Sequence, residues 1–194
     1  MNKIKIISQS LISHIAAGEV IERPSSVVKE LIENSIDAGS DKITIYIEDG
    51  GKEKITVIDN GHGIPKEDLS ICFKQHATSK ISNLEELFNL STLGFRGEAL
   101  SSIATVSRLN VESSIAECDG IGYKTIVTED KVLLEPTKIG RPKGTTIMVE
   151  KLFYNTPARR KHLKSTRVET THIIDIIRKF ALLYPNISFN LEQK

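Results

Sequence analysis

Apolar residues recur along the chain with two different spacings, which predict where helices and strands lie. Residues 43–48 and 54–58 alternate apolar and polar side chains around Gly50-Gly51, which predicts a β-hairpin. A segment from Pro24 has apolar residues at helical spacing, with Gly39 just past its end, which predicts a helix. Further helices are expected at 11–17, 65–73, 97–104 and 168–183, and strands at 3–7, 108–112, 122–128, 132–135, 145–149 and 187–191.

The expected helices and strands occur in blocks rather than in strict alternation. This order predicts an α+β fold, a two-layer α/β sandwich whose mixed, mostly antiparallel sheet has its helices on one face. The 194 residues suffice for one domain with a sizeable core, so we expect residues 1–194 to form a single domain. The last strand ends the chain without a capping element, which suggests the front part of a longer protein.

Composition excludes several classes of protein. Hydrophobic residues make up 39% of the chain and charged residues 26%, as in ordinary globular proteins. No apolar stretch approaches the roughly 18 residues of a membrane span, and no secretory signal is apparent, so we expect a cytoplasmic protein without a membrane partner. Cys72 and Cys118 lie far apart without companions at metal-ligand spacing, so neither a disulfide framework nor a zinc site is expected.

The formal net charge of +1 hides a local excess of basic residues between residues 141 and 167. Within it, Arg159, Arg160 and Lys161 are candidates for non-specific, salt-sensitive contact with DNA phosphates. A solvated basic surface explains the same pattern.

The helix predicted from Pro24 has a polar face that could carry chemistry. Glu30, Asn34 and Asp37 share this face. Such a stripe often only faces water. The chemical alternative is that the carboxylate deprotonates a water while the amide oxygen binds Mg²⁺. Because the sequence contains neither G-x-x-x-x-G-K-[ST] nor G-x-G-x-x-G, a nucleotide would have to bind by a different route.

A second candidate segment, residues 59–63, follows the second strand of the hairpin. An ionised Asp59 is only an acceptor, so it would receive a hydrogen bond from the amino group of adenine and repel the carbonyl oxygen of guanine. Gly61 and Gly63 would let a flat base approach the backbone. An ordinary turn explains the same residues.

A third candidate segment precedes the helix expected at 97–104. It consists of Gly94, Phe95, Arg96, Gly97, Glu98, Ala99 and Leu100. Glycines before a helix start expose N–H groups at the positive end of the helix dipole, which favours anions, although a plain glycine-capped helix start fits as well. Upstream, Thr78, Ser79 and Lys80 offer hydroxyls and an ammonium that could reach phosphates.

Six blocks of the sequence together resemble the N-terminal ATPase region of the MutL family of DNA mismatch repair proteins. These blocks are residues 16–24, 29–38, 59–63, 76–80, 94–100 and 155–160. The resemblance covers nearly the whole chain. The MutL family belongs to a wider ATPase group with DNA gyrase, the Hsp90 chaperone and sensor histidine kinases, and the resemblance implies the α/β sandwich of that group.

The resemblance also implies ATP and Mg²⁺ as cofactors and a role for each candidate residue. Glu30 resembles the general base, Asn34 the magnesium ligand and Asp59 the adenine reader, while Gly61 and Gly63 resemble the turn beside the base. The nucleotide contacts further implied are Asp37, Thr78, Ser79, Lys80, Gly94, Phe95, Arg96, Gly97, Glu98, Ala99, Leu100 and Thr145.

As a function, the resemblance implies an ATP-driven switch in DNA mismatch repair. ATP would close a homodimer, hydrolysis would reopen it, and partners such as a mismatch-recognition protein of the MutS type would respond, leading to strand removal. In the family a following domain supplies a lysine to the γ-phosphate, so we expect slow hydrolysis by this chain. The alternatives are a DNA-binding or interaction module that nucleotide only stabilises, and a sensor kinase or topoisomerase subunit, which blocks 16–24 and 155–160 disfavour.

Overall fold

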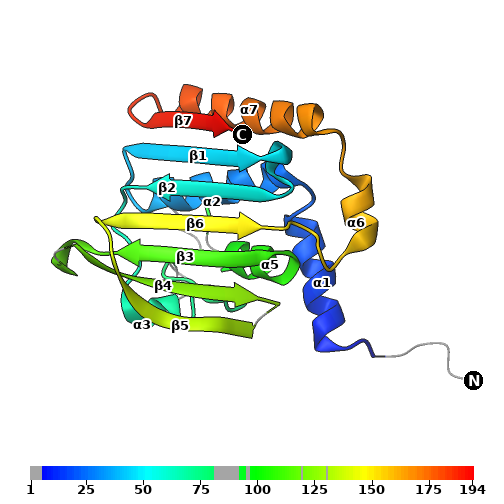
Figure 1. The fold of residues 1–194 in the computed structure, drawn as a ribbon, viewed down its shortest axis with the longest axis horizontal. Helices are drawn as coiled ribbons and strands as arrows, with labels where there is room; N and C mark the ends of the chain where they lie inside the picture. The colour runs from blue at the N-terminus through cyan, green and yellow to red at the C-terminus, as the bar shows by residue number, and fades with distance from the viewer. Residues whose placement is uncertain (1–5, 81–91, 95–96, 119, 130) are drawn as a thin grey trace, which may run out of the picture.

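The computed structural model describes residues 6–80, 92–94, 97–118, 120–129 and 131–194 (Figure 1). Its helices are α1 (Gln9–Val20), α2 (Pro24–Asp37), α3 (Lys66–Leu69), α5 (Ala99–Val106), α6 (Pro157–His162) and α7 (Thr166–Leu183), with short 3₁₀ turns η1 (Asp49–Gly51) and η2 (Ala116–Cys118). Its strands are β1 (Lys42–Glu48), β2 (Lys54–Asp59), β3 (Arg108–Ser114), β4 (Ile121–Thr128), β5 (Lys131–Gly140), β6 (Gly144–Glu150) and β7 (Ser188–Gln193).

The strands form one sheet in the order β5-β4-β3-β6-β2-β1-β7. Every neighbouring pair is antiparallel except β1 and β7, which are parallel. In the view of Figure 1, α2 and α5 lie behind the sheet and α7 runs along its β7 edge. The predicted α+β sandwich with a mixed, mostly antiparallel sheet is therefore confirmed.

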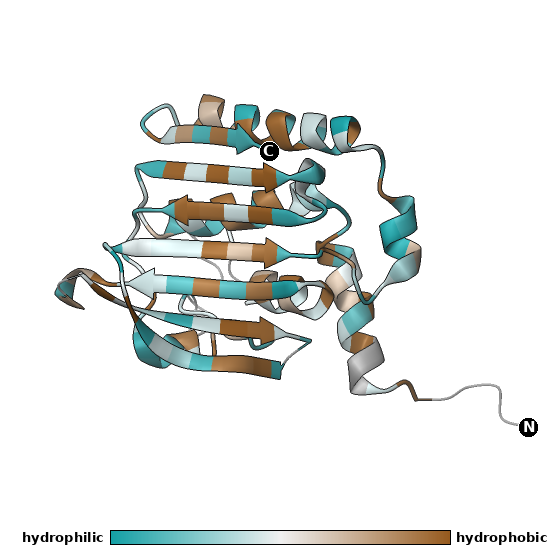
Figure 2. Cartoon of the chain, in the orientation of Figure 1, coloured by the Kyte–Doolittle hydropathy of each residue, from teal (hydrophilic) through white to brown (hydrophobic). Residues whose placement is uncertain are grey.

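The hydrophobic core lies between the sheet and the helices, with buried residues on α2, α5 and α7. In β1, Ile43, Ile45 and Ile47 are fully buried while the residues between them are more exposed, so one face of the strand meets the helices. Figure 2 shows the resulting alternation of brown and pale bands along the central strands. Each such buried aliphatic side chain stabilises the fold by about 1.5–3 kcal/mol relative to leaving it in water.

Helix α2 ends in a hydrogen-bonded cap that fixes the path of the chain into β1. The amide of Ser40 donates to the carbonyl of Ser35 (3.1 Å), and the amide of Gly39 donates to that of Ile36 (2.9 Å). This is the Schellman pattern, and Gly39 occupies its left-handed position with φ 71°. The predicted start at Pro24 and stop at Gly39 are both confirmed.

Two predicted elements differ from the structure. Ile6 and Ile7, the described part of the strand expected at 3–7, lie outside the sheet, are exposed, and precede α1 by one residue. The helix expected at 65–73 is only the single turn α3, and turns continue to Phe73. Among the helices in the described ranges, none has both the length and the apolar character that crossing a membrane requires.

Candidate functional site

Asp59 lies at the end of β2, where β2, the start of β6 and the end of α2 meet. Its Oδ1 accepts hydrogen bonds from the backbone amides of Gly61 (2.9 Å) and Thr145 (3.2 Å). Its Oδ2 lies 3.2 Å from the hydroxyl of Ser35 on α2. The carboxylate is therefore oriented by donors from three separate elements, which is the rigid placement that a specific acceptor needs.

Asp59 is 9% exposed, and its surroundings act on its pKa in opposite directions. Burial disfavours the charged form and raises the pKa, while the hydrogen bonds from Gly61, Ser35 and Thr145 lower it. Burial prevails, so the pKa of Asp59 is higher than that of an ordinary aspartate. An acceptor of this kind loses its charge at a higher pH than a surface aspartate would.

Close packing around Asp59 explains two of the glycines in this region. A Cβ on Gly63, whose φ is 82°, would lie 2.1 Å from the carbonyl oxygen of Ser114. A Cβ on Gly144, whose φ is 115°, would lie 2.1 Å from the carbonyl oxygen of Asp59 itself. Both positions thus require glycine for the strands to approach, independently of any bound base.

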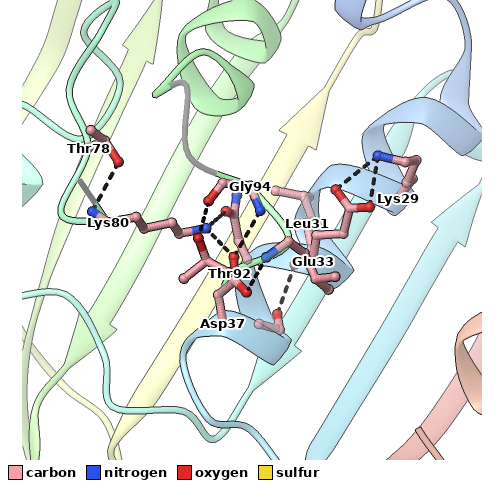
Figure 3. Close-up of polar contacts among 11 residues, drawn as sticks. Lys29, Leu31, Glu33, Asp37, Thr78, Lys80, Thr92 and Gly94 are labelled. Atoms are coloured by element: carbon pink, nitrogen blue, oxygen red, sulfur yellow. Dashed lines mark hydrogen bonds and ion pairs between the residues drawn. The ribbon is translucent and has the colours of Figure 1, made fainter. Parts of the chain in front are cut away.

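A second cluster of contacts lies at the C-terminal end of α2, where the side chain of Asp37 is only 6% exposed. Figure 3 shows this cluster. The ammonium of Lys80 lies 2.5 Å from Asp37 Oδ2 and 3.1 Å from Asn34 Oδ1. The backbone amides of Leu93 and Gly94 donate to the same carboxylate at 2.9 and 3.3 Å. Helix α2 is thereby joined to chain segments 43 to 57 residues further on.

Glu30 lies one helical turn before Asn34 but has a different partner. Its Oε1 accepts a hydrogen bond from Lys29 Nζ at 3.0 Å, and the same ammonium lies 2.9 Å from the Glu33 carboxylate. Partial burial of Lys29 would lower its pKa, but the bonds to Glu33 and Glu30 outweigh it and the pKa is raised. With Lys29 44% and Glu30 22% exposed, such a pair is worth about 0–1 kcal/mol, so water can replace the lysine at little cost.

The other predicted nucleotide contacts fall into three groups. Gly97 and Glu98 directly precede α5, whose first residues are Ala99 and Leu100, so the predicted helix start is two residues early. The hydroxyl of Thr78 accepts a hydrogen bond from the amide of Lys80 (3.1 Å). Phe95 and Arg96 lie outside the described residues.

The predicted DNA-contact residues lie on α6, at the opposite end of the sheet from Asp59 (Figure 1). Arg159 turns inward: its Nη2 donates to the carbonyl of His14 on α1 (3.0 Å), and a Cβ on Gly18 would overlap its guanidinium. Arg160 is about half exposed and pairs with Glu53 at 2.9 Å, and Lys161 is exposed. Only these last two face solvent as a phosphate contact requires.

Sequence reasoning missed the hydroxyl residues that support the site. Ser35 orients Asp59, and Ser113 on β3 contacts Thr145 Oγ1 (3.0 Å) and receives a hydrogen bond from the amide of Ile64 (2.7 Å). Ser35 could have been suspected from a polar residue on the apolar side of α2. Ser113 has no such signal, because its partners come from distant parts of the chain.

Comparison with known proteins identifies the fold family. Residues 21–139, which include α2, Asp59 and α5, match the family described as histidine kinase-, DNA gyrase B-, and HSP90-like ATPase. The chain belongs to this ATPase family.

Curated relatives named DNA mismatch repair protein MutL align with nearly the whole chain. The protein of Lactococcus lactis is 52% identical over 192 residues, which are 98% of this chain and 29% of the relative. That of Listeria innocua is 54% identical over 183 residues, or 94% of this chain and 30% of the relative. The chain thus spans about 30% of the length of these relatives.

Solved structures agree with the sequence comparison. The Aquifex aeolicus MutL ATPase domain complexed with ADP has a TM-score of 0.71 and 34% identity, covering 90% of this chain and 61% of that one. The N-terminal domain of a DNA repair protein has a TM-score of 0.79 and 32% identity, covering 94% of this chain and 52% of that one. The predicted resemblance to the MutL ATPase region is therefore confirmed.

Proposed function

We propose that this chain is the ATP-binding domain of a MutL-type mismatch repair protein, in which residues 1–194 bind and slowly hydrolyse ATP with Mg²⁺. The observation that carries this proposal is the orientation of Asn34, whose amide oxygen accepts a hydrogen bond from the cationic Lys80 at 3.1 Å. If this polar face of α2 only contacted water, it would not be expected to hold a buried carboxylate and to bind the ammonium of Lys80. The family membership and the ADP complex of the Aquifex aeolicus relative add independent support.

The donor set around Asn34 fits a hard cation. Mg²⁺ prefers oxygen ligands and usually keeps waters and substrate phosphates in its other positions, so one amide oxygen is a sufficient protein contribution. The ammonium of Lys80 already stands in for a cation at that oxygen. When bound, Mg²⁺ would supply charge neutralisation on the phosphates.

In the proposed reaction, Glu30 acts on the attacking water. Its carboxylate takes a proton from the water while the water oxygen forms a bond to the γ-phosphorus and the bond to the β–γ bridging oxygen breaks. Asp59, in its ionised form, accepts a hydrogen bond from the adenine amino group. Thr78, Ser79, Lys80, Thr145 and the described residues among 94–100 contribute the remaining nucleotide contacts.

At the level of the whole protein, we propose the mismatch repair cycle that the MutL relatives' name indicates. ATP binding drives formation of a homodimer, hydrolysis reverses it, and a mismatch-recognition protein of the MutS type and non-specific DNA are the partners through which strand removal follows. A cytoplasmic location belongs to the same proposal.

Asn34→Ala tests the metal contact. Removing the amide oxygen should abolish the Mg²⁺-dependent gain in ATP affinity, a loss of at least about tenfold or about 1.4 kcal/mol, while binding of metal-free ATP persists. Calorimetric titration with ATP in Mg²⁺ and in EDTA measures both. The matched control is Asn186→Ala, an exposed asparagine between α7 and β7. The proposal would be contradicted if Mg²⁺ raised the ATP affinity of the variant as much as that of the wild type. It would also be contradicted if the wild type bound no ATP.

The DNA contact is tested by the double substitution Arg160→Glu with Lys161→Glu. If both residues meet phosphates, the dependence of log K on log salt should become shallower by about 2, since each lost phosphate contact removes about one unit of slope. Arg178→Glu with Lys179→Glu, an exposed basic pair on α7, is the control. Equal effects of the two double variants in a salt series of DNA-binding titrations would argue for a general charge effect instead.

A further inference from the structure

Asp37, one of the predicted nucleotide contacts, also joins separate segments of the chain. Its two carboxylate oxygens receive hydrogen bonds from Lys80 Nζ, Leu93 N and Gly94 N. Figure 3 labels Asp37, Lys80 and Gly94 in this cluster. These donors come from both sides of residues 81–91. The carboxylate is 6% exposed and Lys80 20%, so the pair is far less solvated than an ordinary surface ion pair.

Lys80 reaches beyond Asp37 to Asn34, one helical turn away, and there it contacts the oxygen that the proposed function assigns to Mg²⁺. We propose that Lys80 holds the cation position at Asn34 in the nucleotide-free chain and must leave it when magnesium-nucleotide binds, with Asp37 as the positioning residue that sets Lys80 there. This proposal rests on the proposed function, because it concerns the same site.

Charge repulsion prevents the Lys80 ammonium and a divalent cation from binding Asn34 Oδ1 at the same time. A divalent cation ligated by Asn34 Oδ1 would lie next to an ammonium that is 3.1 Å from that same oxygen, and two like charges at such a distance repel strongly where solvent is scarce. Lys80 then has an alternative partner in the phosphates, since an ammonium binds phosphate as a point charge. Binding of magnesium-nucleotide thus exchanges the partners of Lys80, from Asp37 and Asn34 to the phosphates.

The exchange involves more than Lys80. When the ammonium leaves, the buried Asp37 carboxylate keeps only the amides of Leu93 and Gly94 among its described donors. A buried carboxylate without its charged partner is unfavourable, so the fold then depends more on the donors that remain. Occupancy of the cation position is therefore coupled to the backbone at residues 93–94, directly ahead of the residues that lead into α5.

Mn²⁺ without nucleotide tests the competition directly. Lys80→Met should bind Mn²⁺ at least about tenfold more tightly than the wild type, a difference of about 1.4 kcal/mol, in electron paramagnetic resonance titrations of free Mn²⁺. Lys80→Met with Asn34→Ala should lose this gain. Lys80→Arg, which retains a cation, should bind Mn²⁺ as weakly as the wild type, and so should the control Lys138→Met on the exposed strand β5.

Three results would overturn the proposal: no gain for Lys80→Met, a gain that survives Asn34→Ala, or an equal gain for Lys80→Arg. Circular dichroism shows whether each variant is folded, and Lys80→Arg remains informative if Lys80→Met is not. ATP titrations in EDTA separate this proposal from the proposed function. If the wild type binds no ATP, the proposed function fails, whereas the Mn²⁺ comparison still decides whether Lys80 occupies a cation position.

Discussion

Glu30→Gln should slow hydrolysis of bound ATP by about 10²–10⁴-fold, because an amide cannot take the proton of the attacking water. ATP affinity should change little, since glutamine has nearly the same size and Glu30 has no assigned contact with the nucleotide. Single-turnover hydrolysis of radiolabelled ATP with protein in excess measures the rate even where turnover is slow, and calorimetry measures the affinity.

Glu33→Gln is the matched control for Glu30→Gln. Both carboxylates lie on α2, and both accept hydrogen bonds from Lys29, so the two substitutions remove the same charge from the same ion-pair cluster. Only Glu30 is assigned to the water. Comparable losses of rate in the two variants would indicate that the Lys29 cluster supports the helix rather than catalysis, and a wild-type rate for Glu30→Gln would exclude it as the general base.

The parts of the fold that the sequence predicts well are those that local interactions determine. The alternation at 43–48 and 54–58 predicts the β1–β2 hairpin, and proline and glycine at the two ends predict the bounds of α2. The strand expected at 3–7 is a different case, and only residues 6 and 7 of it are described. Its apolar residues satisfy the local pattern, but a strand also needs a neighbour in the sheet, and Ile6 and Ile7 have none among the described residues.

The candidate site shows a similar division between local and distant contacts. Helical spacing alone places Asn34 and Asp37 on one face of α2. No spacing predicts that Lys80, 43 residues after Asp37, would form hydrogen bonds with both. The basic run around Arg159 is the opposite case. It reads as a uniform charged surface, yet the absence of a side chain at Gly18 lets Arg159 pack onto α1, a contact 141 residues away in the chain.

Asp59→Asn should lower ATP affinity by about 100-fold, or about 2.7 kcal/mol. The variant loses a hydrogen bond to a charged acceptor, worth about 1.5–3 kcal/mol, and its amide can present a donor to the adenine amino group. The fold should survive, because the asparagine oxygen can still accept from the amides of Gly61 and Thr145. Calorimetric titration with ATP and GTP measures the loss, and the preference for ATP over GTP should shrink with it.

The pH dependence provides a separate check on Asp59. Since burial raises its pKa, the ionised acceptor and the ATP affinity that depends on it should be lost as the pH falls, starting above the usual aspartate range near about 3.9. Unfolding should show the opposite sign: the raised folded-state pKa contributes stability that is fully present below the unfolded pKa and is lost as pH rises through the folded value. Asp59→Asn should remove both effects, whereas Asp175→Asn, an exposed aspartate on α7, should remove neither. If acid lowered the ATP affinity of the wild type and of Asp59→Asn equally, the proton would be taken up by a different group, adenine itself included. Asp59 would then have no part in recognising the base.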